Sequence, residues 1–206
     1  MLFNILALIS ILIVMIFLGR IVNLFPSLMA CTLRWKESVN LEASVKHSLD
    51  RDMLAVAMFL PFCLTAERFS LYSPGFMDGF SPAIHLIMTI GAFLAFIIIR
   101  GLLTKMIPPR KIPAKTYKTA EKASFTFFII LTFVLLAMGG VMSFIGSDER
   151  VITNAMLCVS AFIYILFLIR KTQIFASGCS FFTAFLYLCA LEFFPTGALV
   201  ASAIIF

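Results

Sequence analysis

The stretch ASFTFFIILTFVLLAMGGVMSFI, residues 123–145, runs for its whole length without a charged side chain. About 20 predominantly apolar residues in a helix cross the roughly 30 Å hydrocarbon core of a bilayer. The stretch therefore predicts a membrane-spanning helix. The whole chain has the same character, because 62% of its 206 residues are hydrophobic and only 13% are charged, about half the charge of an average soluble domain. We predict an integral membrane protein.

The segments on either side of this stretch differ from it in charge and in turn residues. Before it lies RGLLTKMIPPRKIPAKTYKTAEK, residues 100–122, in which Pro108, Pro109 and Pro113 predict an extended loop, because proline interrupts a helix. After it, IGSDER predicts a tight turn into the next apolar segment. The helix over residues 123–145 is thus expected to join a basic loop to a short hairpin.

Six apolar segments in all are bounded by charges or turn residues. They cover residues 2–25, 53–71, 83–99, 123–145, 151–169 and 175–206. The ten-residue alternation typical of a membrane β-barrel does not occur in the sequence. We therefore predict an all-α polytopic bundle of about six transmembrane helices that forms a single membrane domain over residues 1–206.

The basic residues predict the orientation of the bundle. Apart from Arg68 and Arg150, every Lys and Arg falls within or beside the loops over residues 26–52, 100–122 and 170–174, which lie on one side of the membrane. Because cytoplasmic loops are enriched in Lys and Arg, we expect these loops to face the cytoplasm and both termini to face away from it. The predicted location is the inner, cytoplasmic membrane of the cell.

The first cytoplasmic loop contains LRWKESVNLEASVKHSLDRD, residues 33–52, which predicts an amphipathic helix along the inner leaflet. Its apolar side chains recur at four-residue steps, and Trp35 is expected near the headgroups. Glu42 and Lys46 are spaced for an ion pair. Glu42, His47 and Asp50 could alternatively share a metal ion, but convincing third and fourth ligands are lacking, and we expect neither a metal nor another cofactor.

The second cytoplasmic loop is strongly basic. We expect its side chains to contact anionic lipid headgroups; a docking surface for RNA, a ribosome or an acidic protein is the alternative. Tyr117 is its only aromatic residue, so the stacking platform that single-stranded nucleic acid needs is missing, and a nucleic-acid partner is not expected. The basic residues concerned are Arg100, Lys105, Arg110, Lys111, Lys115, Lys118 and Lys122.

Glu192 is the only charged residue between Thr172 and Phe206. A carboxylate inside a membrane has to face the bundle, be paired or stay protonated. Pro195 follows three residues later and is expected to kink or end the helix there. Glu192 therefore predicts either a polar clamp between the last two helices or a proton or substrate site. Phe185, Cys189, Glu192 and Thr196 are expected on one face, with Asn154, Ser160, Tyr164 or an inward-reaching Arg170 as partners.

The last helix carries a recognisable signature. The residues Tyr187, Cys189, Glu192 and Pro195 form a Tyr-x-Cys-x-x-Glu-x-x-Pro run, and Arg170 ends the preceding helix. This pattern resembles the C-terminal signature of an uncharacterised multi-pass membrane family of the Bacteroidota, domain of unknown function 4271. The resemblance implies membrane placement and marks these five residues as candidates for a functional or helix-clamping role. It implies no activity and no cofactor.

The function expected from the sequence is non-enzymatic. Short loops leave little room outside the bilayer for a catalytic domain, and neither a protease constellation nor clustered catalytic carboxylates occur. We expect no catalytic residues and predict a subunit, scaffold or assembly factor whose partner is another membrane protein. The alternative is a small transporter or proton-coupled carrier that uses Glu192 beside the Pro195 kink.

Overall fold

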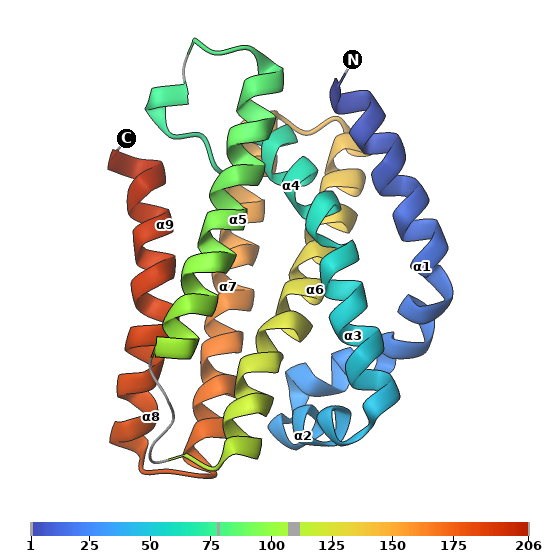
Figure 1. The fold of residues 1–206 in the computed structure, drawn as a ribbon. Helices are drawn as coiled ribbons and strands as arrows, with labels where there is room; N and C mark the ends of the chain where they lie inside the picture. The colour runs from blue at the N-terminus through green and yellow to red at the C-terminus, as the bar shows by residue number, and fades with distance from the viewer. Residues whose placement is uncertain (1, 78, 107–111, 206) are drawn as a thin grey trace.

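The computed structural model describes residues 2–77, 79–106 and 112–205, and within these ranges the chain forms helices and no strands, as predicted (Figure 1). In chain order the elements are α1 (Leu2–Leu33), α2 (Trp35–Ala43), α3 (Val45–Ala57), α4 (Phe59–Arg68), the short 3-10 helix η1 (Gly75–Met77), α5 (Pro82–Met106), α6 (Ala114–Ile145), α7 (Glu149–Ala176), α8 (Phe181–Leu188), the π-helical η2 (Cys189–Phe193) and α9 (Phe194–Ile205).

Five helices in the described part of the chain are long and apolar enough to cross a membrane: α1, α5, α6, α7 and the continuous helix formed by α8, η2 and α9. Their outward faces carry large apolar side chains such as Ile16 and Phe144, which are 76% and 94% exposed. Such surface is stable against lipid but not against water. The predicted all-α polytopic fold is confirmed.

The expected span over residues 53–71 is built from two helices instead of one. α3 ends at Ala57 and α4 begins at Phe59, with Met58 between them. Pro61 explains the break, because its ring clashes with the carbonyl four residues earlier, at Ala57, and it has no N–H to donate there. α3 and α4 nevertheless follow one another along α1 and α6 through the height of the bundle (Figure 1).

The amphipathic helix expected over residues 33–52 is wrong as a single element. The chain is extended at Ser44 (φ −89°, ψ 108°), so α2 and α3 are separate helices. Leu41 is 5% exposed, whereas Val45 and Leu49 are 83% and 60% exposed, so the three do not share a buried face. Glu42 pairs with Arg51 and not with Lys46. A break at Ser44 rotates the two halves independently, which the four-residue spacing could not reveal.

The extended basic loop expected over residues 100–122 is also wrong in its bounds. α5 continues to Met106 and α6 begins at Ala114, directly after Pro113. Proline is tolerated at a helix start because the first N–H groups have no intrahelical partner. Arg110 and Lys111 lie outside the described residues. The other basic residues of this stretch lie on α5 and α6. Their side chains therefore point to different sides of these helices.

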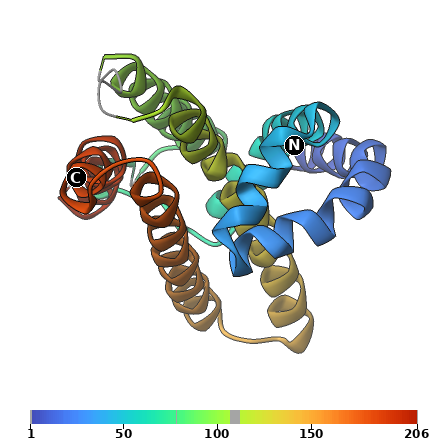
Figure 2. The ribbon, with the colours of Figure 1, turned by 90° about the horizontal axis from the view of Figure 1, so that it is seen from below.

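α6 is the central helix and packs most extensively against α7, while it also contacts α1 to α4. The turn between α6 and α7 is the predicted hairpin: Gly146 has φ 77°, and the Ser147 N–H donates to the Met142 carbonyl at 3.1 Å. Left-handed glycine after a helix end is a common way to satisfy the last carbonyls. Both termini lie toward the same end of the bundle, and α2 lies across the opposite end (Figures 1 and 2).

Candidate functional site

Glu192 lies within η2, a π-helical turn in the middle of the last helix. The Phe194 N–H donates to the Cys189 carbonyl, five residues back, which is the widened spacing of a π-helix. Pro195 has no N–H for the Leu191 carbonyl, and the widened turn directly precedes it. The disturbance predicted beside Pro195 is thus a π turn, and the helix continues through it as α9.

The Glu192 carboxylate is buried, with 2% of the residue exposed, and two cations from other helices bind it. Lys171 of α7, also 2% exposed, donates to Glu192 Oε1. Arg100 of α5 donates to the same oxygen from Nη2 at 2.6 Å and from Nε at 3.2 Å. Because charge-assisted bonds are the strongest protein hydrogen bonds, this cluster joins α5, α7 and the last helix.

Aromatic side chains surround the cluster. Lys171 Nζ lies 5.5 Å from the ring centroid of Phe167 and 5.7 Å from that of Phe175. The Tyr164 hydroxyl donates to the backbone carbonyl of Glu192 at 3.3 Å. An ammonium over aromatic faces is stabilised by their quadrupoles, more so where water is excluded. The environment therefore supports a buried cation on α7.

A second buried ion cluster joins α2, α3 and α6. Arg51, which is 2% exposed, donates from Nη2 to Glu42 Oε2 at 2.9 Å and to Asp52 Oδ1 at 2.8 Å. Lys122 of α6 pairs with Asp52, and Lys118 Nζ lies 3.3 Å from Glu42 Oε1. Both acids thus bridge helices through cations on two elements.

One further carboxylate lies on a helix within the bundle, and the sequence reasoning missed it. Glu67, near the end of α4, accepts a hydrogen bond of 2.7 Å from the Thr89 hydroxyl of α5. Thr89 is fully buried and Glu67 is half-buried. Glu67 lies inside the apolar segment over residues 53–71, directly before Arg68, and a carboxylate within an apolar segment is the signal that could have found it. Its bond contributes to the packing of α4 on α5.

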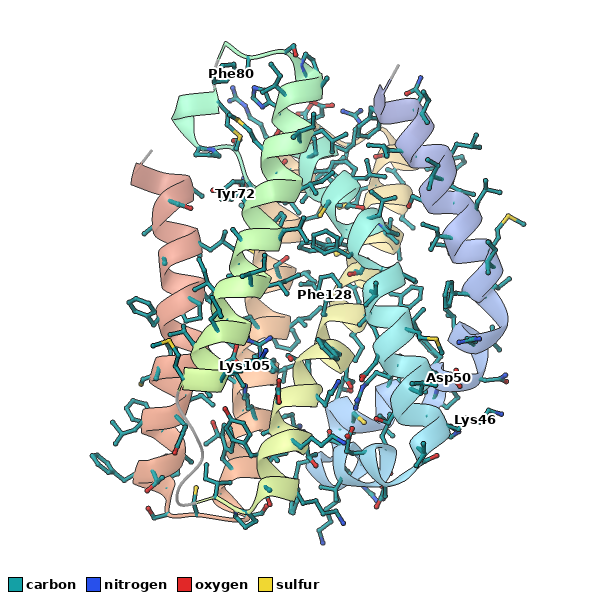
Figure 3. The ribbon with its side chains drawn as sticks, in the orientation of Figure 1. Lys46, Asp50, Tyr72, Phe80, Lys105 and Phe128 are labelled. Atoms are coloured by element: carbon teal, nitrogen blue, oxygen red, sulfur yellow. The ribbon has the colours of Figure 1, made fainter. Side chains whose placement is uncertain are left out.

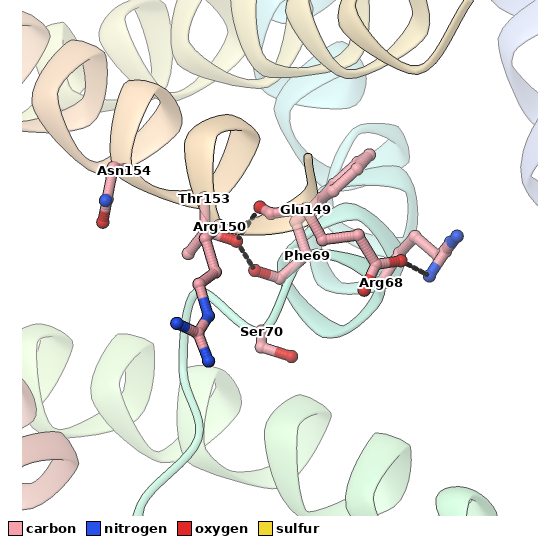
Figure 4. A pocket seen from close by; sticks show the side chains of 7 residues that line it. All are labelled: Arg68, Phe69, Ser70, Glu149, Arg150, Thr153 and Asn154. Atoms are coloured by element: carbon pink, nitrogen blue, oxygen red, sulfur yellow. Dashed lines mark hydrogen bonds and ion pairs between the residues drawn. The ribbon is translucent and has the colours of Figure 1, made fainter. Parts of the chain in front are cut away.

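An open surface pocket of about 330 Å³ lies at the end of the bundle that holds the termini (Figure 4). Within it Arg68 and Glu149 pair at 3.1 Å. The Thr153 hydroxyl donates to the carbonyls of Phe69 and Glu149 at 2.9 and 3.0 Å. Both members of the ion pair are mainly exposed, at 59% and 76%, so the pair contributes little. These contacts hold the α4 end against the α7 start.

His, Cys, Asp and Glu side chains do not gather in groups of three that could hold a metal ion anywhere in the described ranges. The sequence suggested one possible metal-binding set, Glu42, His47 and Asp50. Its two acids pair with different cations. Glu42 binds Arg51, while Asp50 lies 3.4 Å from Arg20 of α1. The geometry provides buried ion pairs and no metal centre in this part of the molecule.

A family model described as "Domain of unknown function (DUF4271)" matches residues 3–202. The chain belongs to the DUF4271 family. Searches of curated proteins and of solved structures found no match. The family match covers both ion clusters of this DUF4271 member, and it confirms the resemblance inferred from the last helix.

The structure brings together some of the signature residues of this DUF4271 chain. Glu192 and Pro195 are buried, and Cys189 is half-buried at the start of η2. Tyr187 lies 6.3 Å from Phe175 and 6.4 Å from Tyr117 between ring centroids. The face expected from a regular helical wheel is wrong, because Phe185 is 48% exposed while Glu192 is buried. The π turn adds a residue and rotates the helix beyond it.

Arg170 does not reach Glu192 in this DUF4271 structure. It donates from Nε to the Thr32 carbonyl at 2.8 Å and from Nη2 to the Leu33 carbonyl at 2.9 Å. Of the partners expected for Glu192, Tyr164 contacts its backbone, whereas Asn154 lines the pocket at the end of the bundle that holds the termini. Lys171 and Arg100 were assigned to loops, so their role was missed. Extending the predicted helices over residues 83–99 and 151–169 by one turn at their C-terminal ends would have placed both residues on membrane helices.

Proposed function

We propose that this protein is a non-enzymatic subunit or scaffold of a complex in the inner membrane of a bacterium of the Bacteroidota, with the α2 end facing the cytoplasm. The observation that carries the proposal is that the buried charged side chains are paired with one another. Glu192 is held by Lys171 and Arg100, and Arg51 is held by Glu42 and Asp52. These ions bind one another across helices and fix the relative positions of the helices.

Fixed helix positions suit a protein whose surface is recognised by a partner. A buried ion pair contributes little net stability relative to apolar residues, but it discriminates strongly against arrangements that leave one charge alone. Two such clusters, one among α2, α3 and α6 and one among α5, α7 and η2, therefore favour a single arrangement of the bundle. The orientation is supported by the concentration of Lys and Arg at the α2 end.

Purification from native membranes tests the scaffold proposal. The tagged protein, extracted in mild detergent at several salt concentrations, is expected to carry one membrane protein in fixed ratio, and a tag on that protein should recover this chain in turn. A monodisperse monomer without a reciprocal partner under all conditions would contradict the proposal.

A proton-coupled carrier is the second candidate, and the π turn favours it. π turns inside helices occur frequently at functional sites, and an ionisable side chain within the membrane commonly marks an ion or substrate pathway. Here η2 holds Glu192 three residues before Pro195. A carrier would release Lys171 from Glu192 during its cycle, while a scaffold would keep the pair closed.

The double variant Lys171→Met with Glu192→Gln separates the two candidates. It keeps the approximate side-chain volumes and leaves an amide oxygen as an acceptor for Arg100, while it removes the central pair. A scaffold should fold and retain its partner with this variant. A carrier should fold and lose its function in cells and any proton flux in proteoliposomes.

A further inference from the structure

Five exposed basic side chains lie at the α2 end of the bundle. They lie on or beside α2, α3, α5 and α6, and none of them pairs with an acidic side chain in the described ranges. Figure 3 places Lys46 and Lys105 in the lower half of the molecule, away from Phe80 at the upper end. We call this set the α2-end basic surface: Arg34, Lys36, Lys46, Lys105 and Lys115.

The surface is basic because the acids at the same end are bound by other cations. Glu42 and Asp52 hold Arg51 together with Lys118 and Lys122. Asp50 lies beside Arg20, and Glu192 holds Lys171 and Arg100. Glu37 accepts a hydrogen bond from Asn40, and Glu121 is exposed. The internal clusters thus remove most of the negative charge that could neutralise the surface.

Trp35 lies between two members of the basic surface in the chain. It is half-buried at the start of α2, between Arg34 and Lys36, and packs against the apolar cluster that includes Tyr117 and Phe175. Lys36 Nζ lies 6.0 Å from its ring centroid. Tryptophan is enriched at the level of lipid headgroups because its ring is apolar and its N–H is polar. Its position indicates that the basic surface lies at that level.

We propose that the α2-end basic surface binds the headgroups of anionic phospholipids in the surrounding leaflet. Its members differ from the basic set expected from sequence, because Arg100, Lys118 and Lys122 pair with acids of the bundle and are not free for lipid. The phosphates would be contacted by ammonium and guanidinium groups that project from several helices at the α2 end. The proposal does not depend on the scaffold or carrier function.

The distribution of the cations favours lipid over a macromolecular partner. Figure 3 shows Lys105 of α5 and Lys46 of α3 on different sides of the molecule, so the two face different sectors around the bundle. A planar leaflet that surrounds the bundle contacts both sectors at once. A single docked RNA or acidic protein would contact one sector, and a single-stranded RNA would also need stacking aromatics between the cations. Anionic headgroups therefore match the arrangement more closely.

Trp35 supplies a local probe, because it is the only tryptophan of the chain. The protein is reconstituted into bilayers in which brominated phosphatidylglycerol or brominated phosphatidylcholine replaces its unbrominated counterpart at equal mole fraction. Bromine on the acyl chain quenches tryptophan fluorescence only at short range. The ratio of quenching by the two lipids then reports the enrichment of anionic lipid beside α2. We expect a ratio above one that falls as salt is raised.

Variants identify the responsible side chains. A basic residue near an anionic surface contributes up to about a fivefold local enrichment, so Lys105→Gln with Lys115→Gln should lower the ratio severalfold without altering residues next to the probe. Arg150→Gln, the matched control at the opposite end, should leave it unchanged. A ratio of one in the wild type, or an elevated ratio that the double variant does not lower, would overturn the proposal. Unaltered circular dichroism establishes that the variants are folded.

Discussion

Arg170 and Lys171 are neighbours in sequence but bind different helices from α7. Arg170 donates to the Thr32 and Leu33 carbonyls at the end of α1, whereas Lys171 donates to Glu192 in the last helix. Consecutive helical residues point about 100° apart, so one turn of α7 joins the first and last membrane helices of the bundle. The arginine of the family-like signature therefore has a structural partner that is distinct from the glutamate.

Removal of the Glu192 carboxylate is expected to destabilise the protein strongly. Glu192→Gln leaves the buried Lys171 ammonium without a carboxylate, and breaking a buried ion pair costs about 3–5 kcal/mol. Arg100→Met should cost less, because the Arg100 side chain is 20% exposed. Thermal unfolding in detergent would measure both.

The double variant Lys171→Met with Glu192→Gln provides the internal control for this prediction. If the residues act as a clamp, the double variant should be more stable than Glu192→Gln alone, because no fully buried ammonium is left without its carboxylate. Additive losses in the two single variants would show that the two side chains stabilise the bundle independently. Lys105→Met, on the same helix as Arg100 but exposed, should leave the unfolding temperature nearly unchanged.

Arg170→Lys is expected to loosen the end of α1 although it keeps the charge. The last carbonyls of a helix have no intrahelical donor. Here one guanidinium donates hydrogen bonds to two of these carbonyls, and a lysine ammonium cannot do so with the same geometry. Hydrogen bonds from a charged group contribute about 1.5–3 kcal/mol each. Trypsin should therefore cleave after Arg34, which is exposed, faster in the variant than in the wild type.

A matched site distinguishes this effect from general destabilisation. Cleavage after Arg68 or Arg150, at the opposite end of the bundle, should proceed at the wild-type rate in Arg170→Lys. Equal acceleration at all three arginines would mean that the whole bundle opens and that the contact to α1 has no local role.

Arg51→Met is expected to disturb the junction of α2, α3 and α6. The substitution leaves Glu42, whose Oε1 is buried without a hydrogen-bond partner in the described ranges, with Lys118 as its remaining cation. The expected loss is again about 3–5 kcal/mol, and it should be insensitive to salt because the pair is buried. Arg68→Met, which removes one side of an exposed pair, should change the unfolding temperature little.

The sequence predicts the helical class because runs such as residues 123–145 have no other stable solution in lipid. It also identifies Glu192 as the one carboxylate of the last span. It does not predict Lys171 or Arg100 as its partners, because a Lys or Arg near a helix end is equally compatible with a loop. The π turn at Cys189–Phe193 and the break at Ser44 are likewise invisible to a regular period, since both shift the face on which later side chains lie.

Gly139 of α6 lies against Met156 of α7 and against Phe69, the residue after α4, and this predicts a contrast with its neighbour. A Cβ at Gly139 would lie 2.8 Å from both Met156 Cε and Phe69 Cε2, whereas a Cβ at Gly140 would meet no atom within 4 Å. Gly139→Ala should therefore overpack the core and cost about 1–3 kcal/mol, and Gly139→Val should cost more. Gly140→Ala should be neutral or slightly stabilising, because alanine favours the helix by about 0.8–1.0 kcal/mol. Unfolding of the two alanine variants in one detergent measures the contrast. Equal stabilities would mean that the Met156 side chain moves aside freely and that Gly139 does not set the distance between α6 and α7.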